Sequence, residues 1–377
     1  MINSEISEIR KQFKHENTSI TKVSGCYIDG EKTVKTKFTE TFLSMPEEET
    51  FKYFEIFKKT LSGRIGKNLI NMEFPLETEF NDGTQAFLMK LRDSELKDEN
   101  LLDEFYNKVI ESYDYTGNYL VLMVYAAYDI PGKTKDNIFM DDASDEVYSY
   151  ILCSICPVNL SKPGLSYYDD TNKFHKRIQD WVVNMPTNGF LFPAFNDRST
   201  DIHSVLYYSK DSEKLNNDFV TSLLGCQLPL SAGGQKESFQ TIIQETLGDE
   251  CEYEIVKNIH EKLNEIIEEH KEKEIPEPLT LDKVEVKNLF NESGVKEEKL
   301  QEFDVRYENI TGGNGTLVAN NVINTRSFEV KTPDVVIKVN PERTDLVETK
   351  VVDGRNCIVI EINDQVEVNG VPVRPSC

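Results

Sequence analysis

Two cysteines, Cys153 and Cys156, lie three positions apart in an apolar segment. This spacing can serve a zinc knuckle or a dithiol redox pair. A zinc site needs a second such pair or paired histidines, but His175 and His203 lie far along the chain. A redox pair needs the start of a helix, whereas Pro157 and an extended segment follow. Residues three apart on a strand face opposite sides, so we expect structural thiols, with no metal and no cofactor.

Residues 58–67, KKTLSGRIGK, form the most basic short stretch of the chain and contain no acid. Its cations are Lys58, Lys59, Arg64 and Lys67. Its GxxG resembles the loop that clamps a nucleic-acid backbone in KH domains. A P-loop is excluded because Asn68 follows the lysine where Ser or Thr is needed. We predict that the four cations contact nucleic acid, and the alternative is a helix end at which lysines suit the dipole and Gly63 is the cap.

The aromatic segment 175–208 contains the single tryptophan, Trp181, together with Phe195 and His203. Several acids nearby suggest a metal or hydrolase site; they are Asp169, Asp170, Asp197 and Asp201. These acids stand beside Asn, Ser and Thr, so turn chemistry accounts for them. His203 has no nucleophile signature near it. We predict no catalytic residue, and the alternative function is an enzyme or ligand-binding regulator with a site in this segment.

Two apolar runs, 119–130 and 147–158, are the elements that must position these groups. Both are rich in β-branched and aromatic residues and are bounded by turn formers, as buried strands are. We predict that they are neighbouring central strands. Alternation over 20–42 around an Asp-Gly pair predicts a hairpin. Apolar spacing predicts helices over 85–91, 99–113 and 214–224, the last closed by Gly225.

Length and composition limit the class of protein. A chain of 377 residues is too long for one small core. No run approaches the roughly 20 apolar residues of a membrane span, and the N-terminal residues have no apolar signal core, so we expect a cytoplasmic protein without a membrane partner. Seven scattered cysteines fit reduced thiols. The net charge of −24 opposes non-specific DNA binding over the whole surface.

The pattern predicts an α+β fold in several parts. We expect a mixed domain with an antiparallel sheet over 1–208, an acidic helical block over 209–310, a linker over 311–325 and a small C-terminal β-meander over 326–377. Residues 237–310 hold 21 acids and 9 bases. A helix pair at 281–290 and 295–307 has the form of a helix-turn-helix, but its acids outweigh its bases, so DNA reading there is disfavoured.

Four segments identify the chain as similar to an uncharacterised Firmicutes family, domain of unknown function four-three-one-seven. They are LRDSELKDENLLDEFY, DASDEVYSYILCSICPVNL, GFLFPAFNDRSTDI and TPDVVIKVNPERTDLVET. The resemblance covers nearly the whole chain. It implies no activity.

The order of elements from Tyr119 onward also resembles the bacterial nucleoid-associated protein family. The features that carry it are a strand pair, the step DFVTSLLGC at 218–226, several helices and a terminal sheet with FEVKTPDVVIKVNPE, DGRNCIVIEI and VEV. The N-terminal third does not match. This resemblance implies a non-enzymatic protein that acts at the nucleoid through DNA, protein partners or both. We expect DNA binding to be weak and salt-sensitive, and association with further copies of the chain is one form such partners take.

Overall fold

A computed structural model describes residues 1–76, 83–133, 139–313, 315–362 and 366–374. The chain forms two compact units, Met1–Ser231 and Ala232–Cys377. A large antiparallel sheet, helices and small C-terminal hairpins confirm the predicted α+β class. No helix within the described ranges is long and apolar enough to cross a membrane.

The first unit is built on an eight-stranded antiparallel sheet. Seven strands follow the order β2-β1-β4-β5-β9-β12-β3, and β8 pairs with the far end of β5. The strands are β1 Lys22–Ile28, β2 Val34–Thr41, β3 Leu69–Glu73, β4 Asn118–Lys133, β5 Phe139–Leu160, β8 Trp181–Val183, β9 Asn188–Phe192 and β12 Ser204–Ser209. The two apolar runs are β4 and β5, paired at the centre as predicted, and the hairpin β1–β2 lies beside them.

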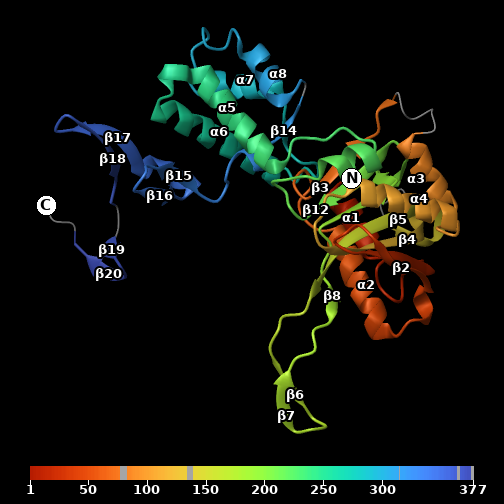
Figure 1. The fold of residues 1–377 in the computed structure, drawn as a ribbon. Helices are drawn as coiled ribbons and strands as arrows, with labels where there is room; N and C mark the ends of the chain where they lie inside the picture. Colours follow the sequence, from red (N-terminus) through yellow and green to blue (C-terminus); the bar gives the residue numbers. More distant parts are fainter. Residues whose placement is uncertain (77–82, 134–138, 314, 363–365, 375–377) are drawn as a thin grey trace. The chain divides into compact units, whose positions relative to one another are not determined.

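Each face of this sheet is covered by helices (Figure 1). One face packs against α3 Thr84–Asp93, α4 Glu99–Ser112 and a π-helical turn, η3 Phe219–Leu223. The other face packs against α1 Asn3–Arg10 and α2 Glu47–Thr60, the latter preceded by a 3-10 turn, η1 Phe42–Ser44. Successive residues of β5 therefore enter different cores, because side chains alternate along a strand. Both faces are apolar, which explains why β5 is buried without interruption from Tyr150 to Val158.

The expected helix over 214–224 forms only in its second part, since residues 217–223 are helical and the last five of them make the π-helical turn η3. Asp211 accepts from the backbone N–H groups of Glu213 and Lys214 in the turn before it. Asn216 accepts from the backbone N–H of Phe219 and so caps the start of the helical residues. Gly225, with φ of 68°, ends the turn as predicted.

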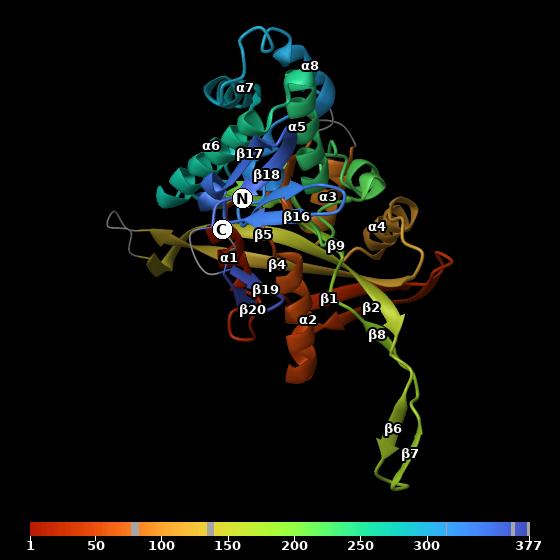
Figure 2. The same ribbon diagram turned by 90° about the vertical axis from the view of Figure 1, so that its left-hand side faces the viewer.

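A two-stranded ribbon continues outward from the sheet. We call residues 159–185 the arm. It contains the end of β5, the hairpin β6 Leu165–Tyr168 and β7 Lys173–Lys176, and the returning strand β8. Figures 1 and 2 both show the β6–β7 hairpin projecting away from the sheet. A further short hairpin, β10 Ala194–Asn196 and β11 Ser199–Asp201, lies between β9 and β12 in sequence.

The second unit begins with helices and ends with three hairpins. Its helices are α5 Ala232–Leu247, α6 Tyr253–Glu272, α7 Lys283–Glu292, α8 Phe303–Thr311 and α9 Ala319–Val322, with 3-10 turns η4 Gly248–Glu250 and η5 Pro341–Leu346. A small pair, β13 Thr280–Leu281 and β14 Leu317–Val318, joins them. The hairpins are β15 Phe328–Lys331 with β16 Val336–Val339, β17 Val347–Val352 with β18 Arg355–Ile360, and β19 Val366–Val368 with β20 Val371–Val373.

The C-terminal strands form three separate two-stranded sheets. Part of the segment expected to be a linker, 311–325, is built into the helical region. Leu317 and Ala319 are buried, and the Gln235 side chain of α5 accepts a hydrogen bond from the Val318 N–H at 2.8 Å.

Candidate functional site

The basic segment 58–67 forms the last turn of α2 and the loop that follows it. We call it the basic turn. Lys58 and Lys59 lie in the final helical turn, where cations suit the helix dipole. Gly63 and Gly66 have φ of 123° and 75°, a backbone conformation that side chains disfavour. The GxxG is therefore a reversal between a helix and strand β3.

The four cations of the basic turn remain available to an external anion. Lys59 and Arg64 are exposed, and Lys58 and Lys67 are half-buried. Among the described residues, none of the four makes an ion pair or a side-chain hydrogen bond. Lys35, by contrast, lies 2.6 Å from Asp29. Unpaired cations next to two glycines, which let the backbone come close to a ligand, suit contact with phosphate groups.

Buried hydrogen bonds hold the basic turn against the sheet. The Thr60 hydroxyl lies 2.6 Å from that of Ser154 on β5, and both residues are buried. On the other side, the Asn68 side chain donates to the Ser209 carbonyl at 3.0 Å. The Thr187 N–H donates to the Ile155 carbonyl at 2.9 Å. The basic turn is thereby fixed on the part of the sheet from which the arm leaves.

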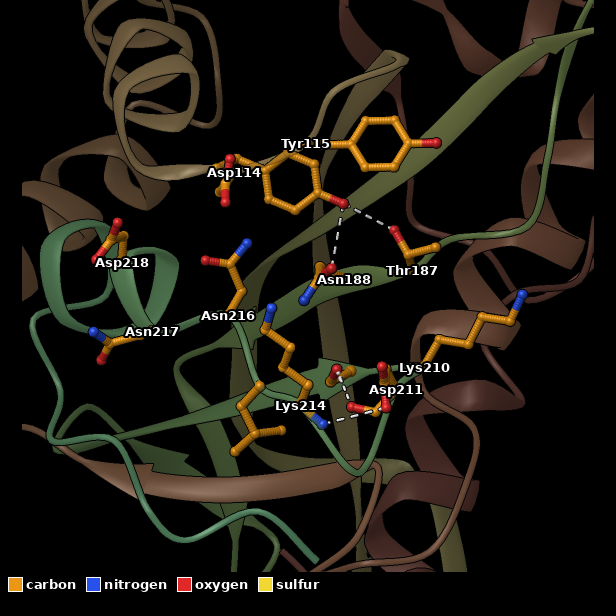
Figure 3. A pocket seen from close by; sticks show the side chains of 13 residues that line it. Asp114, Tyr115, Thr187, Asn188, Lys210, Asp211, Lys214, Asn216, Asn217 and Asp218 are labelled. Atoms are coloured by element: carbon orange, nitrogen blue, oxygen red, sulfur yellow. Dashed lines mark hydrogen bonds between the residues drawn. The ribbon is translucent and has the colours of Figure 1, made fainter. Parts of the chain in front are cut away.

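A pocket of about 670 Å³ lies at the same end of the first unit (Figure 3). Three segments line it; they are 113–115, 187–188 and 209–218, without residues 212 and 213. The Tyr113 hydroxyl lies 3.0 Å from the Thr187 hydroxyl and 3.3 Å from the Asn188 side-chain oxygen. The Asn188 amide donates to the Tyr207 hydroxyl at 2.6 Å. These contacts make a connected polar floor under the pocket.

The lining groups are better suited to binding than to proton transfer. Burial raises the pKa of the Tyr113 hydroxyl well above its usual range, so it stays protonated near neutral pH. Asp211 accepts backbone hydrogen bonds that shape its turn. In Figure 3 the Lys214 side chain extends toward Asn188 and Asn216. The pocket thus offers two lysines, three carboxylates and several amide and hydroxyl groups.

The aromatic residues that suggested a cleft do not come together. Trp181 lies on β8 in the arm with its side chain exposed. Phe195 is fully buried, with its ring centroid 4.6 Å from that of Tyr148. His203 is exposed at the turn before β12. Thr187 and Asn188 are therefore the part of the predicted segment that lines the pocket.

The nearby acids serve turns, as predicted. Asp197 lies at the reversal between β10 and β11 with φ of 52°. Asp201 accepts from the Asn196 side chain at 2.6 Å and from the His203 N–H at 3.0 Å. Burial alone would raise the pKa of Asp201, but hydrogen bonds that include those from Ser204 and Asn196 outweigh it and lower the pKa. These contacts explain the residues without a bound ion.

The two cysteines of the CxxC point in opposite directions. Cys153 packs in the core beneath α3 and α4, and Cys156 packs in the core beneath α2. Burial raises the pKa of both thiols far above the range of a reactive thiolate. Within the described ranges, no group of three or more His, Cys, Asp and Glu side chains is placed to hold a metal ion.

Two features escaped the sequence reasoning. The pocket is assembled from segments about 70 and 20 residues apart, for which no local pattern exists. One sequence signal could have indicated the arm. After Val158 the chain alternates apolar and polar residues, and no helix of the described residues covers the apolar ones.

The family model described as "Domain of unknown function (DUF4317)" matches residues 1–371. The chain therefore belongs to this family. No curated protein matches the chain.

Proposed function

We propose that this protein acts without catalysis in the cytoplasm of a Firmicutes bacterium, as a nucleoid-associated-like protein that works through protein partners, DNA or both. The order of elements from Tyr119 onward, which resembles that of the nucleoid-associated family, supports this proposal. The main structural support for this proposal is the exposure of apolar side chains on the arm. The central strand of the sheet extends beyond the core into a ribbon covered with exposed apolar side chains.

An isolated two-stranded ribbon is marginally stable in water. The arm nevertheless exposes its largest side chains: Leu165 by 75%, Phe174 by 69%, Ile178 by 71% and Trp181 by 55%. Exposed apolar residues gathered this far from the core favour contact with another macromolecule, because they add little to the core of the isolated unit. A small-molecule site would instead need a concave surface.

The basic turn is the part of the chain that we expect to contact DNA. With a net charge of −24, the chain can approach a duplex only through a local basic surface. Four unpaired cations that each neutralise one phosphate give a slope of about −3.6 in log affinity against log salt concentration. Affinity should therefore fall roughly 150-fold between 50 and 200 mM salt.

Fluorescence anisotropy with a labelled 30-base-pair duplex tests this contact. The wild type should bind at 50 mM salt with the slope given above. Replacing Lys58, Lys59, Arg64 and Lys67 together by Gln should remove most of the binding. A matched variant with the exposed Lys11, Lys14, Lys22 and Lys32 changed to Gln alters the net charge equally and should retain it. If the wild type does not bind DNA at low salt, the proposed function reduces to binding of protein partners. If both variants lose DNA binding equally, the loss is due to the change in net charge and not to the basic turn.

The pocket supports a second function, that of a ligand-binding regulator. The specific observation is the connected floor of Tyr113, Asn188 and Tyr207 beneath a volume of about 670 Å³. Lys214 favours a ligand that carries an anionic group. A thermal-shift screen of small anionic metabolites tests this function, and a hit that binds in the pocket should lose its stabilising effect in Lys214→Met. A hit that stabilises both chains equally would lie elsewhere.

A further inference from the structure

We infer that the arm pairs with the arm of a second copy of this chain about a twofold axis. The inference rests on the proposed function in that it names the protein partner. It is carried by three properties of the arm: its apolar area, its charge and the order of its side chains along the ribbon.

One face of the β6–β7 hairpin is apolar. Register pairs Leu165 with Lys176 and Tyr167 with Phe174, and alternation places these four residues on the same face. Tyr167 and Phe174 contact each other with ring centroids 5.3 Å apart. Nearer the sheet, Trp181 pairs with Leu160 on the same ribbon. The ribbon therefore has apolar groups along its length.

The exposed apolar area matches what one partner gives to a stable interface. The apolar side chains concerned are Leu160, Leu165, Tyr167, Phe174, Ile178, Trp181, Val183 and Met185, each between 40% and 75% exposed; Val182 is left out because alternation places it on the face opposite Trp181. Together they present on the order of 800 Å², given the surface of large apolar side chains. A standard interface buries about that area on each partner, whereas the largest apolar patch of a typical monomer is about 300–600 Å².

The charge of the arm favours a second copy over DNA. Between 159 and 185 the chain has four Lys and Arg residues and three Asp residues, so the arm carries +1 and the remaining residues carry −25. Unlike the basic turn, the arm mixes its four cations with acids, so phosphate groups would approach Asp169 and Asp170 at the tip. Two arms, each with a net charge of +1, associate with little repulsion.

The order of side chains along the apolar face is self-complementary. A twofold axis level with the Ser166–His175 pair lays the two arms against each other in opposite directions. Tyr167 then comes level with Leu165 of the second copy. Phe174 comes level with Lys176 of the second copy, whose aliphatic stem can cover the ring. Each of these contacts occurs twice.

Sedimentation velocity between 1 and 100 µM tests the pairing. The wild type should be a dimer, and Leu165→Ser/Tyr167→Ser/Phe174→Ser should weaken the association about 100-fold or more, because it removes the central contacts. A matched variant, Ile275→Ser/Val284→Ser/Val305→Ser, removes three exposed apolar residues of the second unit and should remain a dimer. Circular dichroism establishes that each variant is folded.

A monomeric wild type at 100 µM, or a dimer that survives the triple serine change, would overturn the pairing. If a monomeric wild type still binds the labelled duplex, the proposed function stands and only the pairing fails. A dimer that does not bind DNA supports the pairing and removes DNA from the proposed function.

Discussion

Gly189 lies where strands β5 and β9 approach each other too closely for a larger residue, so its replacement should destabilise the sheet beneath the site. It lies on β9 opposite Ser154 of β5, next to Asn188 of the pocket floor. A Cβ atom at this position would lie 2.3 Å from the Cys153 carbonyl oxygen and 2.6 Å from the Thr60 methyl carbon. Normal contacts between non-bonded heavy atoms are about 3.5–4.0 Å. Gly189→Ala must therefore push β9 away from β5.

The expected cost follows from which atoms are involved. The carbonyl belongs to the neighbouring strand, so no change of side-chain rotamer relieves that contact. Overpacking of a well-packed core costs about 1–3 kcal/mol, and a clash with backbone places Gly189→Ala at or above the upper end. For a unit of this size, about 3 kcal/mol lowers Tm by roughly 6–12 °C. Thr60→Ser in the same background removes the methyl contact and should recover part of the loss.

Thermal unfolding followed by circular dichroism measures this effect. Gly164→Ala is the matched control, because a Cβ atom there meets nothing within 4 Å. Its Tm should stay unchanged or rise slightly, since Ala restricts the unfolded chain. A Gly189→Ala chain that melts within about 2 °C of the wild type would refute the close approach of β9 to β5 on which the site geometry depends.

Further predictions concern the thiols, the hydroxyls and the chain segments. Burial raises the pKa of Cys26 to about 11 and that of Tyr119 to about 12, so their contribution to stability is full below about pH 9. It is lost as the pH rises through these values, and urea midpoints should fall steadily between pH 9 and 11. In mass-spectrometric alkylation, Cys251 should react in the native chain, whereas Cys153 and Cys156 should react only after unfolding; equal native rates would contradict their burial. Dilute protein treated briefly with proteinase K, which has no need of Lys or Arg, should be cut in the arm before it is cut between 317 and 323; early cleavage at 317–323 would show that this stretch is not held by α5.

The central strands could be predicted because their signal is local. Residues 119–130 and 147–158 are apolar on both faces, and a strand covered by helices on both sides needs that pattern. The divergence of Cys153 and Cys156 followed from the strand period alone. The Asp-Gly pair at the β1–β2 turn likewise indicated a hairpin that the structure contains.

The pocket could not be predicted because it depends on non-local packing. Tyr113 ends α4, Asn188 begins β9 and Lys214 follows β12, and only the sheet order brings them together. The helix predicted over 214–224 starts late for a local reason, since Asp211 accepts the N–H groups of Glu213 and Lys214 in a turn and Asn216 caps the helical residues from 217 onward. Apolar periodicity indicated the helical stretch but not the capping residue that sets its start.

Strand β5 connects the features on which the function depends. Its middle is buried from Tyr150 to Val158, so it is among the most rigid parts of the unit. Ser154 in that stretch anchors the basic turn through Thr60, and the Ile155 carbonyl anchors Thr187 at the edge of the pocket. Beyond Val158 the same strand becomes the exposed arm. Because all three features are fixed to one rigid strand, arm pairing would set the separation and orientation of two basic turns. Two such turns on one dimer would bind a duplex more tightly than either alone, so variants that dissociate the arms should also weaken DNA binding.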